Sequence, residues 1–205
     1  MTFMKKYAFQ IALMALVVLM AIYLSFAYNI FGGKEKLPVI KEVGDFTLTN
    51  LSGEEESFAD SNGKVRLVYF FFANCPEECP ATTVIAREVQ DTLKQRGDFG
   101  SKVEFKWISI DPHRDTPTLM KQYADGYGAD QSGWSFLRGE AQQIVDVANN
   151  GFDLGVLNSS PENLVHMDII SVVDQDGRIR SRIRGGGDDT LTPERILQDI
   201  DSLLD

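Results

Sequence analysis

A continuous apolar run over residues 67–72 ends just before the two cysteines of the chain, Cys75 and Cys79. The run is rich in aromatic and branched side chains, which is typical of a strand buried on both faces inside a parallel sheet. The segment 81–95 that follows spaces its apolar residues along one face of a helix. The cysteines therefore lie on a strand-to-helix turn. Ligands bind at this end of the strands in open α/β sheets, so we expect the chemistry of the protein there.

The rest of the chain alternates between strand and helix patterns. Strands are predicted at 46–51, from 57, at 103–110, 134–137, 168–173 and 178–184, and helices at 118–127, 141–149 and from 192 to near 204. This order predicts an α/β protein with a central mixed sheet and helices on both of its faces. The closing hairpin and helix, together with the strand–cysteine–helix unit, indicate a thioredoxin-like fold.

An apolar N-terminal segment precedes this domain. Residues 8–28 carry no charge and are long enough to cross about 30 Å of hydrocarbon as a helix. Lys5 and Lys6 precede the segment, so the positive-inside rule predicts a cytoplasmic N-terminus and a domain on the outer, extracytoplasmic face. We expect a cytoplasmic N-terminus over 1–7, a single transmembrane anchor over 8–30, a linker over 31–44 and the thioredoxin-like domain over 45–205.

A cleaved signal peptide, processed around residues 25–27, is the alternative to an anchor. The apolar core is longer than the roughly 7–15 residues typical of a signal peptide, and its flank lacks a clear turn. No cysteine follows directly to accept a lipid. We therefore favour an uncleaved anchor.

The domain is acidic. From Lys34 onward it holds 18 of the 20 basic residues and all 30 acidic ones, which gives a formal charge of −12. A nucleic-acid binder shows a basic footprint instead, so nucleic acid is not an expected partner. An acidic domain is also not attracted to anionic lipid. The single helix, rather than surface charge, would hold the protein at the membrane.

One structural disulfide is the ordinary explanation for two cysteines in an exported domain. Three observations argue against it here. The loop closed by such a disulfide would be very short, so the crosslink would lower the entropy of the unfolded chain only slightly. A domain of roughly 160 residues buries a sufficient core without a crosslink. A proline also follows each cysteine, which is an unusual way to build a simple crosslink.

The prolines also shape the expected helix start. Proline disfavours helical angles in the residue before it, so Pro80 is predicted as the first helical residue and Cys79 as the N-cap. A thiolate there faces backbone N–H groups and the positive end of the helix dipole, which lowers its pKa. The carboxylates of Glu77 and Glu78 would raise the pKa of the thiol if they lie near it, so the sequence leaves the net pKa shift open.

Three residues separate the cysteines, and this spacing leaves room for a metal ion between the two sulfurs. Two thiolates are soft donors that favour Cu(I) and tolerate Zn(II). A third ligand must come from elsewhere, and the chain has two histidines, His113 and His166. A lone histidine is by default a structural residue, but their scarcity favours a ligand role for one of them. Met167 offers a further soft donor, although a methionine beside a strand usually belongs to the core.

Four motifs in order resemble the Sco/SenC family, over about residues 45–185. They are Cys-Pro-x-x-Cys-Pro after an aromatic strand, Asp-Pro-x-x-Asp-Thr-Pro at 111–117, Trp-x-Phe-Leu-x-Gly at 134–139, and His166 eight residues before Asp174 of a Val-Asp-x-x-Gly turn. That family consists of membrane-anchored copper-binding proteins of cytochrome c oxidase assembly. Met167 departs from its pattern, because the residue after the histidine is usually small or hydroxylated.

The resemblance implies that Cys75, Cys79 and His166 bind copper, as Cu(I) or Cu(II), with Asp111 nearby. It implies a non-enzymatic metallochaperone that serves the binuclear copper site of an oxidase subunit. The copper-bearing subunit of the oxidase is then the expected partner, and other copper chaperones or thiol reductants are further candidates.

Two alternatives use the same cysteines differently. A thiol–disulfide oxidoreductase would use Cys75 and Cys79 as redox-active thiols that pair as a disulfide, and would reduce the cysteines of the oxidase copper site. The two roles are compatible on one scaffold. A thiol peroxidase is weaker, because the comparable enzymes carry a threonine three residues before the reactive cysteine, where this chain has Phe72.

Overall fold

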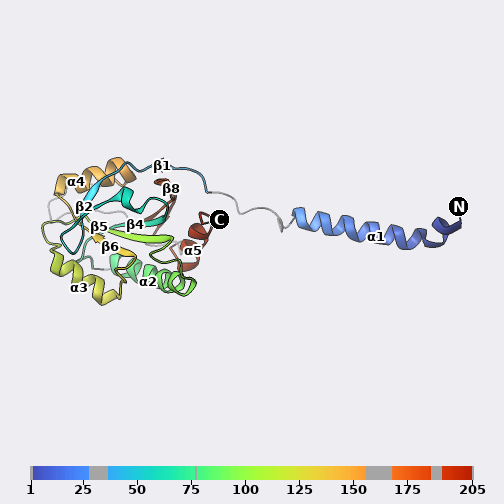
Figure 1. The fold of residues 1–205 in the computed structure, drawn as a ribbon, viewed down its shortest axis with the longest axis horizontal. Helices are drawn as coiled ribbons and strands as arrows, with labels where there is room; N and C mark the ends of the chain where they lie inside the picture. Colours follow the sequence, from blue (N-terminus) through green and yellow to red (C-terminus); the bar gives the residue numbers. More distant parts are fainter. Residues whose placement is uncertain (1, 28–36, 77, 156–167, 186–190, 205) are drawn as a thin grey trace. The chain divides into compact units, whose positions relative to one another are not determined.

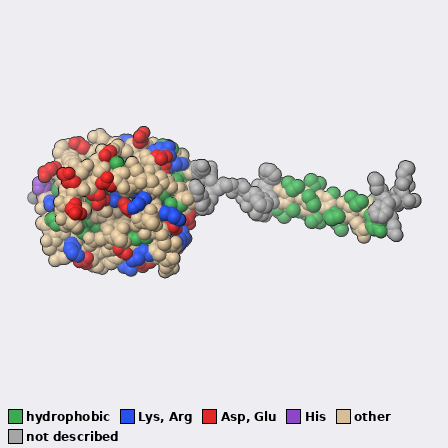
Figure 2. Space-filling model, in the orientation of Figure 1, with side chains coloured by type: hydrophobic (Ala, Val, Ile, Leu, Met, Phe, Trp, Pro, Cys, Tyr) green, Lys and Arg blue, Asp and Glu red, His purple; other side chains and the backbone are tan. Residues whose placement is uncertain are grey.

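The computed structural model describes residues 2–27, 37–76, 78–155, 168–185 and 191–204, in two units, Met1–Lys36 and Leu37–Asp205 (Figure 1). The first unit holds helix α1 (Thr2–Ala27). Of the described helices, α1 alone is long and apolar enough to cross a membrane, over Tyr7–Leu24. Apolar side chains cover this helix (Figure 2). Residues 28–30, the end of the expected anchor, lie outside the described residues.

The second unit is built on a six-stranded sheet. Its strands are β1 (Lys41–Glu42), β4 (Val65–Phe71), β5 (Val103–Ser109), β6 (Trp134–Leu137), β7 (Ile169–Val173) and β8 (Arg178–Arg184). They lie in the order β1-β8-β7-β4-β5-β6. Strand β4 pairs parallel with β5 and antiparallel with β7, so the sheet is mixed. A separate hairpin joins β2 (Thr47–Thr49) and β3 (Glu55–Ser57).

Helices cover both faces of this sheet. One face carries α2 (Glu78–Arg96), α3 (Pro117–Tyr127) and α5 (Pro193–Asp201). The other carries the 3-10 turn η1 (Phe58–Ser61), helix α4 (Ala141–Asp146) and the π-helical turn η2 (Val147–Gly151). Figure 1 shows α4 on the side of the strands opposite to α2 and α3. The predicted α/β architecture is thus confirmed.

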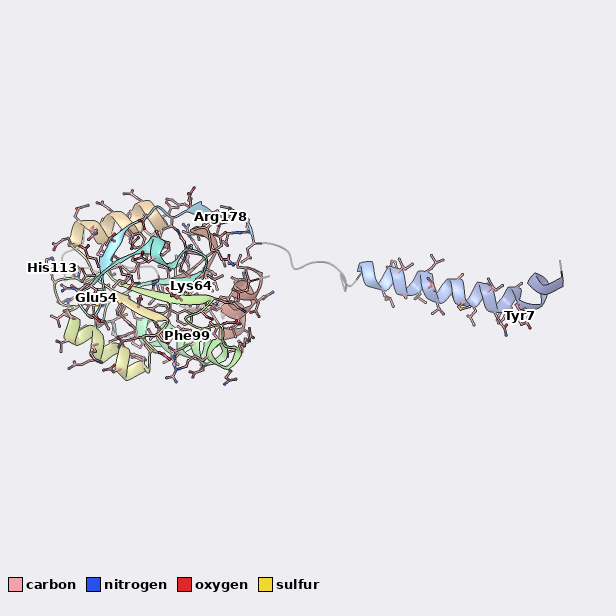
Figure 3. The ribbon with its side chains drawn as sticks, viewed as in Figure 1. Tyr7, Glu54, Lys64, Phe99, His113 and Arg178 are labelled. Carbon is pink, nitrogen blue, oxygen red and sulfur yellow. The ribbon has the colours of Figure 1, made fainter. Side chains whose placement is uncertain are left out.

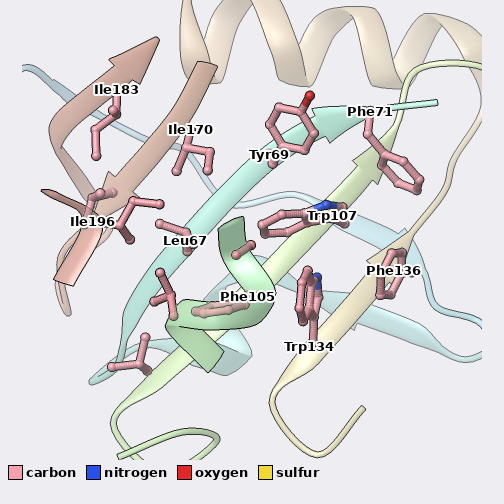
Figure 4. Packing of buried hydrophobic residues seen from close by; sticks show 14 of the residues in the cluster. Leu67, Tyr69, Phe71, Phe105, Trp107, Trp134, Phe136, Ile170, Ile183 and Ile196 are labelled. Atoms are coloured by element: carbon pink, nitrogen blue, oxygen red, sulfur yellow. The ribbon is translucent and has the colours of Figure 1, made fainter. Parts of the chain in front are cut away.

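Strand β4 is buried along its whole length, as predicted. Leu67, Tyr69 and Phe71 enter the core beneath α2, α3 and α5, whereas Val68 and Phe70 enter the core on the opposite face. This division follows from the alternation of side chains along a strand. Figure 4 shows the aromatic side chains of β4, β5 and β6 packed beside one another. The strand that precedes the cysteines is therefore held rigidly from both sides.

The predicted linker is the main difference from the expected elements. The linker expected over 31–44 shows no strand pattern in its sequence, but Lys41–Glu42 forms the edge strand β1 and pairs antiparallel with β8. Val43 is buried, and its N–H donates to the Gly177 carbonyl at 2.8 Å. A strand of two residues is too short to show alternation, so the sequence pattern cannot reveal it.

Candidate metal centre

The cysteine turn begins where β4 ends. The N–H of Cys75 donates to the Phe72 carbonyl at 3.1 Å, and α2 starts at Glu78. The prediction that Cys79 is the N-cap and Pro80 the first helical residue is therefore wrong, because both residues lie inside the first turn of the helix. Proline is tolerated there, since the N–H groups of a first turn have no acceptor within the helix.

The two cysteines lie against each other on this turn, and both are buried. The Cys79 N–H donates to the Cys75 Sγ at 3.3 Å, so a backbone donor of the first helical turn is directed at the sulfur of Cys75. Cys75 is 6% exposed and Cys79 is fully buried. Both thiols belong to the core cluster beneath α2. The turn thus brings two soft donors together in a water-poor setting.

Burial determines the direction of the Cys79 pKa shift, which the sequence left open. Burial raises the pKa of the Cys79 thiol well above its ordinary value, and a hydrogen bond with Cys75 raises it further. Hydrogen bonds with the Phe72 backbone and with Tyr69 oppose this shift without overcoming it. Desolvation disfavours the charged form of a thiol, so burial favours the protonated form of Cys79.

Hydroxyl groups surround the thiols. Tyr69 and Thr82 both donate to Oδ1 of Asp168, each at 2.9 Å. Tyr123 donates to the Cys79 carbonyl at 3.1 Å and shares a 2.7 Å hydrogen bond with Thr83. No motif in the sequence predicted these residues. Their one local signal is the pair of adjacent threonines at 82 and 83 at the start of the predicted helix, and both are buried.

The Asp-Pro loop contacts the cysteine turn through Asp115, and the placement of Asp111 near the metal stays a prediction. The Asp115 carboxylate accepts the Ala73 N–H at 3.1 and 3.2 Å and the Ser109 hydroxyl at 2.5 Å. Burial raises the pKa of Asp115. Asp111 is also buried, and its carboxylate is ion-paired with Arg114.

Two of the three predicted ligands are brought together, and the third is not described. His166 and Met167 lie outside the described residues, in the stretch 156–167 before β7. His113 is exposed at the surface of the domain (Figure 3). Within the described part of the chain, no three His, Cys, Asp or Glu side chains form a metal cluster. The assignment of His166 as a ligand therefore stays a prediction.

The model of the SCO1/SenC family matches residues 35–205. The chain belongs to the SCO1/SenC family. The family membership indicated by the four motifs is confirmed. The thioredoxin-like fold predicted from the order of strands and helices is confirmed as well. This SCO1/SenC protein is 31% identical to a SCO1 protein homolog of Bacillus subtilis over 157 residues, which cover 75% of the chain and 80% of that protein.

Solved structures of the SCO1/SenC family resemble the chain over most of its length. BsSco, a member of the Sco family of cytochrome c oxidase assembly proteins with a disulfide switch, matches with a TM-score of 0.70 and 27% identity. That match covers 82% of the chain and 96% of BsSco. Bradyrhizobium japonicum ScoI with copper bound matches with a TM-score of 0.63 and 26% identity, over 79% of the chain and 99% of ScoI.

Proposed function

We propose that this SCO1/SenC protein is a copper metallochaperone of cytochrome c oxidase assembly. It binds copper through Cys75, Cys79 and His166 and assists assembly of the binuclear copper site of the oxidase. The observation that carries the proposal is the pair of buried cysteines held against each other on one turn. The copper-bound ScoI and the assembly role of the Sco family support it.

The donor set suits copper as cargo. Thiolate sulfurs are soft and select Cu(I) over the harder divalent ions, and a further imidazole donor suits copper in either oxidation state. Cys79 is fully buried, and a buried site excludes competing water ligands. Two hydrogen bonds hold the turn: the Ala73 N–H donates to Asp115, and the Tyr123 hydroxyl donates to the Cys79 carbonyl. The cysteine turn is thus held in place before the metal arrives.

A thiol–disulfide oxidoreductase is the second candidate, and the contact between the two thiols favours it. Cys75 and Cys79 would give up two electrons and two protons and form one S–S bond, while a disulfide on the oxidase subunit is reduced to two thiols. The disulfide switch of BsSco supports this alternative. Redox exchange needs the two sulfurs alone, whereas tight copper binding also needs the imidazole.

Oxidase assembly tests the proposal in cells. Deletion of the gene should lower oxidase activity and the copper content of the purified oxidase, because the subunit would receive less copper. The wild-type chain should restore both, and a Cys75→Ser, Cys79→Ser double variant should restore neither. A normal copper content in the oxidase of the deletion strain would contradict the proposed role.

We further propose that α1 is an uncleaved anchor that leaves the domain on the outer face of the membrane. Its apolar window Tyr7–Leu24 supports this topology. After alkaline carbonate washing of membranes, the chain should stay in the pellet at its full length. A soluble form that begins near Tyr28 would instead show that a signal peptide is removed.

A further inference from the structure

Helix α3 and the residues just before it contact the cysteine turn at two places. Asp115 directly precedes Thr116, which is the N-cap of α3, and Pro117 is the first helical residue. These three residues end the Asp-Pro motif at 111–117. One hydrogen bond from this region reaches the chain before Cys75, and another reaches Cys79 itself. One element therefore holds the segments that carry both thiols.

Asp115 holds the segment that leads into Cys75. Asp115 is fully buried, and its two carboxylate oxygens lie 3.1 and 3.2 Å from the Ala73 nitrogen, which donates to them. The Ser109 hydroxyl at the end of β5 donates to Oδ2 of the same carboxylate at 2.5 Å. Hydrogen bonds to a carboxylate are stronger than neutral ones. Because Ala73 lies between β4 and Cys75, Asp115 fixes the path of the chain toward the first thiol.

Tyr123 of α3 holds Cys79 through a chain of hydrogen bonds whose directions are determined. The Trp107 indole can only donate, and its Nε1 donates to the Thr83 hydroxyl at 3.3 Å. A backbone carbonyl can only accept, and the Cys79 carbonyl accepts from the Tyr123 hydroxyl at 3.1 Å. Thr83 must therefore donate to Tyr123 across the 2.7 Å between their oxygens. Every proton in this chain points toward Cys79.

The contact between the cysteines lies between these two holding points. The Cys79 N–H donates to the Cys75 Sγ at 3.3 Å. Holding two reacting groups in one geometry raises their effective concentration toward each other. A turn that is free to move would also adopt arrangements in which the sulfurs are apart. The two holding points therefore bear on how readily the sulfurs react with each other.

We propose that Asp115 and Tyr123 are positioning residues that set the thiol–disulfide equilibrium of Cys75 and Cys79. When the disulfide forms, the thiol pair gives up two electrons and two protons, and one S–S bond forms. The oxidant is a second disulfide, whose S–S bond breaks to give two thiols. This inference rests on the proposed function only in that Cys75 and Cys79 are its working thiols, since both candidate roles use them.

The test uses the full-length chain in detergent, without copper, equilibrated in mixtures of oxidised and reduced dithiothreitol. Alkylation and mass spectrometry then count the free thiols, and the chain has two cysteines to count. Asp115→Ala and Tyr123→Phe should each shift the equilibrium toward the thiol pair by about 3- to 30-fold, the range for one lost buried hydrogen bond. This shift makes the reduction potential about 15 to 45 mV less negative.

Asp115→Asn is the conservative variant that should rescue the loss. Its amide oxygen can accept the Ala73 N–H, and its amide N–H can donate to the Ser109 hydroxyl. The positions of both neighbours are then kept without the carboxylate charge. The thiol–disulfide equilibrium of Asp115→Asn should therefore stay close to that of the wild type.

Two variants serve as matched controls. Tyr127→Phe makes the same chemical change as Tyr123→Phe one turn further along α3, where the two ring centroids lie 4.6 Å apart. Asp45→Ala removes a carboxylate that also accepts one backbone N–H and one serine hydroxyl, from Ala59 and Ser57, but beside the β2–β3 hairpin. Both controls should keep the wild-type equilibrium.

Thermal unfolding of each variant in excess reductant records the stability of the fold separately. A lower melting temperature of Asp115→Ala and Tyr123→Phe with an unchanged thiol–disulfide equilibrium would show purely structural roles and overturn the proposal. An equal shift of the equilibrium in the two controls would overturn it as well.

Cu(I) titration of the wild-type chain separates this inference from the proposed function. If the chain binds no Cu(I) but Asp115→Ala and Tyr123→Phe shift the equilibrium as expected, the proposed function fails and this inference stands. If the chain binds Cu(I) and neither variant shifts the equilibrium, this inference alone is overturned.

Discussion

His166→Ala should lower the copper affinity of the chain by more than the roughly 10- to 100-fold typical of losing a residue that only supports a ligand. The substitution removes an imidazole and leaves both sulfurs in place, so a poorer third donor must replace it. The reduction potential of Cys75 and Cys79 should change little. In cells, oxidase activity should fall and recover in part when copper is added in excess.

His113→Ala is the matched control for this prediction. His113 is an exposed imidazole on the same domain, in a loop that matches no ligand position of the family. Its replacement should leave copper affinity and oxidase activity as in the wild type. If His166→Ala binds copper as tightly as the wild type, His166 is a structural residue. The oxidoreductase would then be the better account of the protein.

Replacing either cysteine with serine should abolish tight copper binding. Serine is close in size to cysteine, but its hydroxyl is a hard, neutral donor that does not replace a thiolate for Cu(I). Cys75→Ser is the cleaner variant, because Cys79 is fully buried and a hydroxyl there must find a new partner. The measurement is the same chelator competition, with thermal unfolding recorded alongside.

Thr83→Ser is a useful control for the cysteine variants. Thr83 is buried near the same turn and is hydrogen-bonded to Tyr123, but it offers no soft donor. It should retain wild-type affinity. A Cys75→Ser chain that binds Cu(I) with wild-type affinity would show that the thiol pair is not the metal site.

The buried strand and the cysteine turn were predictable because their signals are local. The run at 67–72 has the composition of a strand buried on both faces, and β4 is buried over Val65–Phe71. The start of α2 was wrong by two residues, because proline fits inside a first helical turn as well as at its first position. The sequence alone does not distinguish these two placements of Pro80.

The hydrogen bonds around the thiols could not be predicted, because they join residues far apart in the chain. Tyr69 and Asp168 are 99 positions apart, and Ala73 and Asp115 are 42 apart. No periodic pattern links such pairs. The direction of the Cys79 pKa shift depends in the same way on burial beneath α2, which the folded domain reveals.

X-ray absorption spectroscopy of the copper-loaded, full-length chain tests the central claim most directly, because it reports the atoms bound to the metal. The account predicts one copper per chain with two sulfur donors and one imidazole nitrogen. The Cys75→Ser chain should lose one sulfur donor, and the His166→Ala chain should lose the imidazole signal. A wild-type spectrum without sulfur donors, or an imidazole signal that persists in His166→Ala, would contradict the assigned site.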